Sequence, residues 1–148
     1  MSVYVDTSAL AKWYIRESFS DEFDQFIRSS GKPVISRLSI VEFRCLLARR
    51  RRAGSLSRKN EADALRTFDE DMRLGFLHVV SLQDMHFTLA HDLIERLKDI
   101  PLRTLDALHL AIASNTGHAR LATADRIQAE AAHSLGMHID KFFSSEPT

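Results

Sequence analysis

Length, composition and charge exclude several classes of protein. The chain has 148 residues, of which 45% are hydrophobic, with 20 basic and 20 acidic side chains. This composition excludes a disordered or low-complexity chain and is typical of one globular domain with a buried core. A protein that is basic over its whole surface is also excluded. The charge is uneven, however, because residues 1–60 carry 12 basic and 6 acidic side chains, so a local basic surface for nucleic acid stays open.

The cysteine content and the hydropathy pattern limit the environment. Cys45 is the only cysteine in the sequence, which excludes an internal disulfide and a zinc site made of cysteines. Asp6 interrupts the apolar N-terminal residues, so we expect no signal peptide. The longest run without a charged side chain, 107–119, is shorter than the roughly 20 residues that cross a bilayer. We therefore expect a cytoplasmic protein that makes no membrane contact.

Short runs of β-type residues alternate with longer helical patterns along the chain. The expected strands are 3–5, 34–35, 78–80, 120–122 and 138–139, and the expected helices are 8–16, 19–29, 38–53, 57–74, 84–97, 104–116 and 125–135. The strands are too short for independent hairpins, and helical sequence separates each strand from the next. This order predicts a five-stranded, mostly parallel sheet with crossover helices in a single α/β domain over 1–148. The tail from about residue 142 is expected to fray.

Two acidic residues follow expected strands. Asp6 comes directly after the first strand, and Asp125 follows the fourth by a short turn. In an open parallel sheet, ligands bind beyond the carboxyl ends of the strands. If both strands are central, these two carboxylates lie at the same edge of the sheet.

Two further acids interrupt apolar helical sequence. The segment 105–114 is apolar nearly all round, which predicts a buried helix, and Asp106 and His109 are its only ionisable residues. A buried carboxylate is costly unless it is paired or binds a metal ion. Asp106 is therefore a metal ligand, the partner of His109 or an arginine, or an acid favoured near a helix N-terminus. Glu42, with Ser39 one turn before it, is either a second such group or a helical glutamate that faces solvent.

These four acids lie on four different elements, each next to apolar sequence. Carboxylates that gather without fixed cations repel one another, and a divalent cation removes that repulsion. Ligands that are all oxygen favour Mg²⁺ or Mn²⁺ over zinc or copper. The seven histidines show neither HxH nor HExxH spacing, so no metal site made of histidines is expected. His109 and Cys45 are interpreted as core residues.

Four motifs carry a family resemblance. They are VDTSAL at 5–10, SIVE at 39–42, PLRTLDALHLA at 101–111 and ATADR at 122–126. In order and spacing they resemble the four acidic motifs of PIN-domain nucleases, from residue 3 to about residue 140. Within that family, the compact size resembles the VapC-type toxins of bacterial toxin–antitoxin pairs.

The resemblance implies a fold, an activity and partners. The fold is a three-layer α/β/α arrangement around the central, mostly parallel five-stranded sheet. The activity is that of a ribonuclease toxin that hydrolyses RNA phosphodiester bonds with Mg²⁺ or Mn²⁺. A cognate antitoxin protein neutralises such a toxin, and the toxin itself forms a homodimer.

The resemblance also assigns roles to individual residues. It implies that Asp6, Glu42, Asp106 and Asp125 line the metal site. We expect Asp6 and Asp106 to be the direct ligands, and Glu42 and Asp125 to act through water or a second metal ion. The resemblance also implies hydroxyl groups at Thr7 or Ser8 and at Thr123 that orient these carboxylates or water, and Ser39, one turn before Glu42, is expected to do the same. The expected products of hydrolysis carry 5′-phosphate and 3′-hydroxyl ends.

Two further segments have two interpretations each. Four consecutive arginines, Arg49, Arg50, Arg51 and Arg52, either bind RNA phosphates or form the solvated end of a helix before Gly54. The aromatic residues Trp13, Tyr14, Phe19, Phe23 and Phe26 either form a groove for an antitoxin peptide or pack the first two helices together.

Other functions stay open at this point. The same fold suits a catalytically silent module that binds RNA or an antitoxin. A phosphatase-like hydrolase would use Asp6 as a covalent nucleophile, but such enzymes carry a second aspartate two residues on, where Ser8 stands here. A signalling domain phosphorylated on aspartate needs a lysine near the last strand, and Lys141 is poorly placed for that role.

Overall fold

The computed structural model describes residues 2–145. Its centre is a five-stranded sheet in the order β3-β2-β1-β4-β5, and every neighbouring pair of strands is parallel. The strands are β1 (Val3–Val5), β2 (Pro33–Ser36), β3 (His78–Val80), β4 (Arg120–Thr123) and β5 (His138–Lys141). The sequence-based prediction of a mostly parallel five-stranded sheet is therefore confirmed.

Seven helices surround the sheet in the described part of the chain. They are α1 (Thr7–Tyr14), α2 (Ser20–Ser29), α3 (Arg37–Arg52), α4 (Arg58–Arg73), α5 (Asp84–Arg96), α6 (Thr104–Asn115) and α7 (Arg126–Ser134). Each begins and ends within two residues of its predicted bounds. None of the helices in residues 2–145 has the length and apolar character that a membrane span requires.

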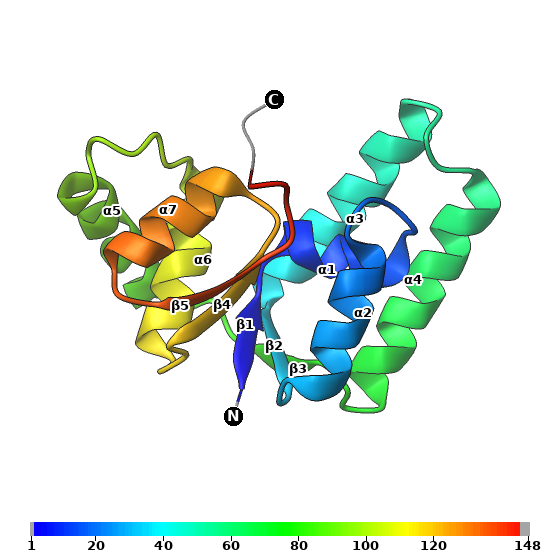
Figure 1. Ribbon diagram of the computed structural model, residues 1–148, viewed down its shortest axis with the longest axis horizontal. Helices are drawn as coiled ribbons and strands as arrows, with labels where there is room; N and C mark the ends of the chain where they lie inside the picture. The colour runs from blue at the N-terminus through cyan, green and yellow to red at the C-terminus, as the bar shows by residue number, and fades with distance from the viewer. Residues whose placement is uncertain (1, 146–148) are drawn as a thin grey trace.

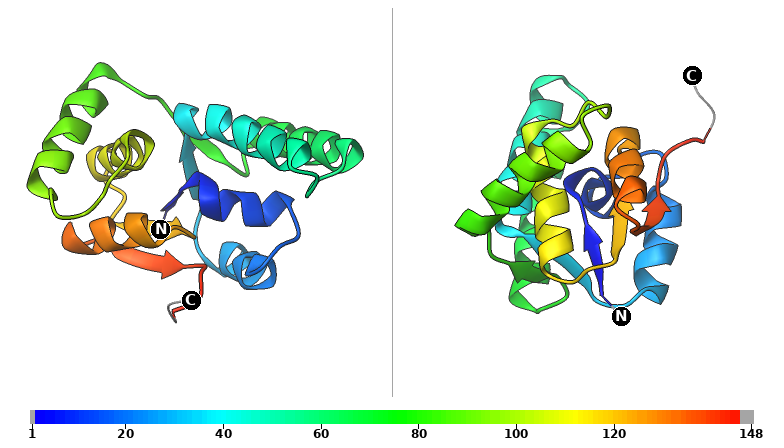
Figure 2. Two further views of the ribbon diagram at one scale, coloured as in Figure 1. Left: turned by 90° about the horizontal axis from the view of Figure 1, so that it is seen from above. Right: turned by 90° about the vertical axis from the view of Figure 1, so that its left-hand side faces the viewer.

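The helices form two layers, one on each face of the sheet. Helices α1 to α4 lie on one side of the sheet and α5 to α7 on the other, as Figures 1 and 2 show. The side chains of β1 alternate accordingly, because Val3 and Val5 pack into the core under α1 to α4 and Tyr4 packs into the core under α5 to α7. The architecture is the expected three-layer α/β/α arrangement.

The last described segment differs from the expectation of a frayed tail. Phe142 directly follows β5 and is buried, with its ring centroid 5.1 Å from that of Phe23 and 5.2 Å from that of Phe26. Its backbone N–H also donates to the carbonyl oxygen of Thr123 at 2.9 Å. Aromatic packing therefore holds the chain in place beyond residue 141, and residues 146–148 lie outside the described part.

The strand order indicates which edge of the sheet can bind a ligand. β1 is central, and the chain extends the sheet from it to β2 on one side and, later, to β4 on the other. The carboxyl ends of β1 and β4 are aligned, since Val5 pairs with Ala122. Such a reversal of strand order leaves a crevice beyond the strand ends, which is the usual ligand site of open α/β sheets.

Candidate active site

A cleft of about 820 Å³ opens at this edge of the sheet. The four acidic residues singled out in the sequence, Asp6, Glu42, Asp106 and Asp125, all line it. They come from the end of β1, from α3, from the first turn of α6 and from the turn between β4 and α7. The structure thus brings together residues that are far apart in the sequence.

Asp6 is buried at the end of β1. It caps the N-terminus of α1, because one carboxylate oxygen accepts a hydrogen bond from the backbone of Ala9 at 3.1 Å. Ser8 Oγ donates to the same oxygen at 2.6 Å, and Thr123 Oγ1 donates to the other at 2.5 Å. Burial nevertheless raises the pKa of Asp6 above its ordinary value, although these hydrogen bonds act in the opposite direction. No lysine or arginine of the described chain forms an ion pair with it.

The turn after β4 is tied to the turn after β1. Ser8 Oγ accepts a hydrogen bond from the backbone of Ala124 at 2.9 Å, and Thr123 Oγ1 accepts one from the backbone of Asp125 at 3.0 Å. Asp125 in turn caps α7 through the backbone N–H of Ile127 at 2.8 Å. The predicted supporting residues Ser8 and Thr123 therefore position both Asp6 and Asp125.

Glu42 reaches the cleft from α3 and is partly buried. Thr7 Oγ1 donates to its Oε1 at 2.8 Å, and His109 Nε2 forms a short contact with the same oxygen. Burial raises the pKa of Glu42, but the hydrogen bonds and charge of its partners, above all His109, outweigh burial and hold the pKa below its ordinary value. Glu42 is therefore ionised at neutral pH, and Thr7 lies where the sequence predicted a supporting hydroxyl.

Asp106 lies in the first turn of α6, with a side chain that is 19% exposed. Its Oδ2 accepts a hydrogen bond from the backbone of Arg103 at 3.3 Å, and the Arg103 guanidinium lies 4.0 Å away. Burial raises the pKa of Asp106, and the neighbouring carboxylate of Asp125 raises it further. The apolar helix that carries it is buried from Ala107 to Ala113, as its sequence predicted.

The acids fit a cation with few direct protein ligands. Among residues 2–145, no three Asp, Glu, His or Cys side chains lie close enough together to bind one ion. Asp6 and Asp106 are oxygen donors whose pKa is raised in the absence of a cation, a pattern that a divalent ion reverses. Mg²⁺ retains several waters and uses one or two carboxylates, so this donor set suits it.

The arginine tract divides into different environments. Arg49 is exposed and lines the cleft, whereas Arg52 is exposed outside it. Arg50 pairs with Glu17, and Arg51 Nε lies 2.8 Å from an oxygen of Glu61. Of the four predicted RNA-binding residues, the structure therefore places only Arg49 beside the acids.

Some predictions about individual residues differ from the structure. Ser39 is buried and accepts a hydrogen bond from the backbone of Ser36 at 3.1 Å, but it contacts none of the four carboxylates. The predicted core residue Cys45 is exposed and lines the cleft, because it lies one turn after Glu42 on the same face of α3. The spacing of three residues between Glu42 and Cys45 was the sequence signal that could have predicted its position in the cleft.

Sequence reasoning missed two groups that shape the cleft. Arg103 lines the cleft and, in addition to Arg49, brings a positively charged guanidinium beside Asp106. Tyr4 is buried, and its hydroxyl lies 2.7 Å from Nδ1 of His109, which is buried as predicted but also contacts Glu42. The sequence singled out His109 as a possible partner of Asp106, whereas the structure places it between Tyr4 and Glu42.

Comparisons with known proteins show which sequences this chain resembles. The family model for the PIN domain matches residues 3–134. Ribonuclease VapC46 of Mycobacterium tuberculosis (strain ATCC 25618 / H37Rv) is 34% identical over 141 residues, which cover 93% of this chain and 95% of that protein.

Solved structures share the fold at lower identity. The crystal structure of Mycobacterium tuberculosis VapC20, described as a sarcin-ricin loop cleaving toxin, superposes with a TM-score of 0.70 at 18% identity and covers 87% of this chain and 94% of its own. VapBC2 from Rickettsia felis, bound to a DNA fragment from its promoter, gives a TM-score of 0.65 at 14% identity, with 96% and 99% coverage.

Proposed function

The chain belongs to the PIN domain family, and on that premise we propose that it is a metal-dependent endoribonuclease, the toxin of a toxin–antitoxin pair. The observation that carries the proposal is the convergence of Asp6, Glu42, Asp106 and Asp125 in one cleft at the carboxyl edge of the sheet. The similarity to Ribonuclease VapC46 over nearly the whole chain supports RNA as the substrate.

Two of the acids are proposed to hold the cation directly. Asp6 and Asp106 are the carboxylates with raised pKa, so they gain most from a positive charge. Mg²⁺ or Mn²⁺ held there would polarise a phosphoryl oxygen and lower the pKa of a water molecule. Glu42, which is ionised, and Asp125 are proposed to orient water or a second cation in the cleft. Ser8 and Thr123 hold Asp6 in place through the hydrogen bonds described above.

Two arginines beside the acids are proposed to bind the RNA backbone. Arg49 and Arg103 line the cleft with the four carboxylates. Phosphate groups need cations, because a carboxylate cluster alone repels them. Contacts of this kind are independent of base sequence, so the choice of RNA depends on the shape of the target around the cleft.

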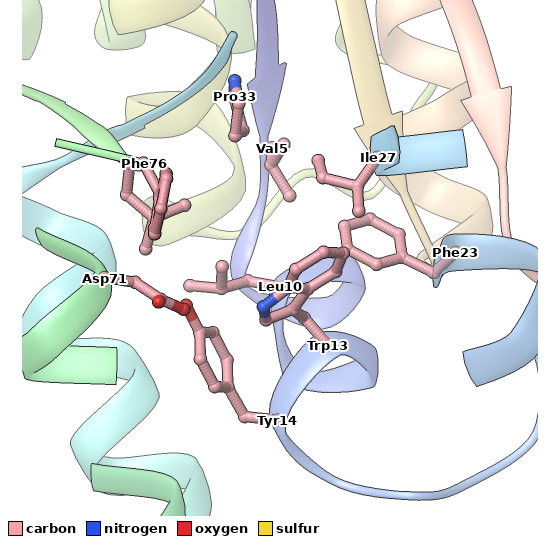
Figure 3. A pocket seen from close by; sticks show the side chains of 10 residues that line it. Val5, Leu10, Trp13, Tyr14, Phe23, Ile27, Pro33, Asp71 and Phe76 are labelled. Carbon is pink, nitrogen blue, oxygen red and sulfur yellow. The ribbon is translucent and has the colours of Figure 1, made fainter. Parts of the chain in front are cut away.

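A second pocket supports the proposed antitoxin partner. Trp13, Tyr14 and Phe23 of α1 and α2 line a small cavity of about 60 Å³, closed on the other side by Phe76, which is 63% exposed (Figure 3). Phe23 packs in the core, which agrees with the packing interpretation of the sequence, and Trp13, which also packs against that core, lines the cavity as well. An apolar side chain of an antitoxin peptide is the proposed occupant.

The apolar side of the cleft supports the proposed homodimer. Val41, Ile94 and Leu105 line the cleft and are between 41% and 64% exposed. Exposed apolar side chains that cluster in this way mark interaction surfaces. Light scattering on the purified chain tests the proposal, and Leu105→Asp should shift the mass towards that of one chain.

The experiment that tests the activity is RNA cleavage by the purified protein. Cleavage is expected with Mg²⁺ or Mn²⁺, and both a chelator and Asp106→Asn should abolish it. Asp69→Asn is the matched control, since Asp69 is an exposed carboxylate on α4 that does not line the cleft. Cleavage that persists in Asp106→Asn contradicts the assigned site. If no cellular RNA acquires new 5′-phosphate ends when the toxin is induced, the catalytically silent binding module is the better account.

A further inference from the structure

A hydrogen-bonded chain of buried side chains leads from the sheet to Glu42. The Tyr4 side chain points from β1 into the core under α5 to α7, and its hydroxyl donates to Ser36 Oγ at 2.9 Å. The same hydroxyl lies 2.7 Å from Nδ1 of His109 on α6. Three elements, β1, the end of β2 and α6, therefore meet at a single phenol oxygen.

The second nitrogen of His109 continues the chain to the cleft. His109 Nε2 forms a short contact with Oε1 of Glu42, and Thr7 Oγ1 donates to that same oxygen at 2.8 Å. The other carboxylate oxygen, Oε2, has no hydrogen-bond partner among residues 2–145, and Glu42 lines the cleft. One oxygen of the carboxylate is thus anchored, while the other is left for the contents of the cleft.

We propose that Tyr4 and His109 are positioning residues that fix the Glu42 carboxylate for the reaction proposed above. A glutamate has three rotatable side-chain bonds, and on a helix surface it samples several rotamers. Anchoring Oε1 at two points removes this freedom, which the reaction would otherwise have to restrict at each turnover. The inference rests on the proposed function for its catalytic consequence, but not for its structural content.

The alternative is that Tyr4 and His109 merely satisfy each other in the core. The described chain offers a comparison, because His86 is also buried and has two partners, the backbone N–H of Gln83 at 2.9 Å and Asn115 Oδ1 at 3.0 Å. Those partners lie outside the cleft, and His86 ties α5 to α6. His109 differs in that one of its two partners is a cleft carboxylate. This difference provides a matched control for the loss of a buried imidazole.

The test uses Tyr4→Phe and His109→Gln, with His86→Gln as control. Tyr4→Phe keeps the ring in the core and removes only the oxygen that holds His109. The first measurement is made on the metal-free protein without RNA, by NMR couplings and relaxation of the Glu42 side chain. A single rotamer is expected in the wild type and in His86→Gln, and averaging over rotamers in the other two variants.

The second measurement is cleavage of the RNA that the wild type cuts. Tyr4→Phe is expected to lower kcat about 10-fold with little change in KM, a size typical of groups that orient a metal-site residue. His86→Gln should leave kcat within a factor of two, even if it lowers the melting temperature as much as Tyr4→Phe does. Melting curves identify unfolded variants, and if His109→Gln does not fold, Tyr4→Phe decides alone.

Each outcome separates the positioning role from the activity. Loss of the single Glu42 rotamer together with the fall in kcat supports both. A Glu42 side chain that stays in one rotamer in Tyr4→Phe and His109→Gln overturns the positioning role. If Glu42 becomes disordered in these variants but the wild type cuts no RNA, the positioning stands and the proposed function fails.

Discussion

Thr123 Oγ1 donates a hydrogen bond to Asp6 Oδ2 across 117 residues of sequence. The same hydroxyl accepts a hydrogen bond from the backbone of Asp125, so one buried side chain supports two of the four cleft acids. Its position follows from the parallel pairing of β1 with β4, which aligns the ends of the two strands. The carboxylate geometry of the cleft therefore depends on a residue that does not itself carry charge.

Replacing Thr123 should weaken metal binding more than it weakens the fold. Thr123→Val keeps the shape of the side chain but removes the donor to Asp6, whereas Thr123→Ser keeps the hydroxyl. We expect Thr123→Val to lower the affinity for Mn²⁺ about 10-fold, as is typical for groups that orient metal ligands, and Thr123→Ser to restore most of it. Calorimetric titration measures both. Equal affinities in the wild type and Thr123→Val would show that this hydroxyl does not orient the site.

Removing the Asp106 carboxylate should stabilise the metal-free protein. Burial and the neighbouring Asp125 raise the pKa of Asp106, so its ionised form is less favourable in the folded chain than in the unfolded chain. We expect Asp106→Asn to raise the melting temperature of the metal-free protein by about 1 to 3 °C at pH 7, while abolishing cleavage. A lower melting temperature for Asp106→Asn would contradict this account of the site.

The stability of the metal-free protein should also depend on pH through this carboxylate. Because the folded-state pKa is raised, the folded chain binds more protons than the unfolded chain between the ordinary and the raised pKa. The Asp106 contribution is thus fully present below the ordinary carboxyl pKa and is lost as the pH rises through the folded-state pKa. Urea unfolding at several pH values should show a smaller loss with rising pH in Asp106→Asn than in the wild type.

Metal binding should release protons for the same reason. Asp6 and Asp106 both have raised pKa values, and a cation binds only their ionised forms. The affinity for Mn²⁺ should therefore increase as the pH rises through these pKa values. Titrations in buffers of different ionisation enthalpy measure the protons released, and Asp106→Asn should release fewer. A heat of binding that is independent of the buffer would refute the coupling.

The four acids were visible in the sequence because each breaks an apolar pattern or ends a strand. Asp6 and Asp125 follow short apolar strands, and Asp106 interrupts a helix that is otherwise buried. A carboxylate in such a position is costly, so a single sequence is enough to mark it as unusual. The parallel sheet was also predictable from the sequence, because short strands alternate with helices along the chain.

His109 was visible as an ionisable residue on an apolar helix, but its contact with Tyr4 could not be identified in this way, because neither side chain is costly in its position. A tyrosine in a buried strand and a histidine on a buried helix are common, and both find partners inside the core. Their contact joins residues 105 positions apart and depends on the packing of α6 against the sheet. The role of the pair becomes apparent only when Glu42 is seen against the second ring nitrogen.

The arginine tract shows the opposite case, because helical geometry alone predicts which of its arginines faces the cleft. Successive residues on an α-helix point about 100° apart, so four consecutive arginines cannot all face one ligand. Arg49 lies seven residues after Glu42, two turns along the same face, which is why it lines the cleft. The cluster of basic charge in the sequence therefore overstated the number of arginines beside the acids.

Phe142 provides a test of the described C-terminal segment. Its ring is buried against Phe23 and Phe26 of α2. Phe142→Ala should lower the free energy of unfolding by about 3 kcal/mol, because truncating a buried aromatic side chain leaves a cavity. Phe143→Ala, at the adjacent position, is the comparison in chemical unfolding experiments. If Phe142→Ala changes the free energy of unfolding by less than about 0.5 kcal/mol, which is the range of surface substitutions, the segment is frayed as the sequence predicted.

The arginines of α3 should separate RNA binding from stability. Arg49 lines the cleft without an ion pair in the described chain, so Arg49→Ala should weaken RNA binding and lower the salt dependence of the binding constant by about 0.7 in slope. Arg51 pairs with the largely buried Glu61, so Arg51→Ala should instead lower the free energy of unfolding by about 1 kcal/mol. Arg52→Ala, exposed outside the cleft, should change neither quantity.

These variants are compared by RNA binding at several salt concentrations in the Asp106→Asn background, where the RNA is not cut, and by urea unfolding. Because all four arginines carry the same charge, a general electrostatic effect would weaken binding equally in Arg49→Ala and Arg52→Ala. Equal losses would therefore contradict a specific role for Arg49. A loss confined to Arg49→Ala places the RNA backbone along the face of α3 that carries Glu42, since the two side chains lie two turns apart and line the same cleft.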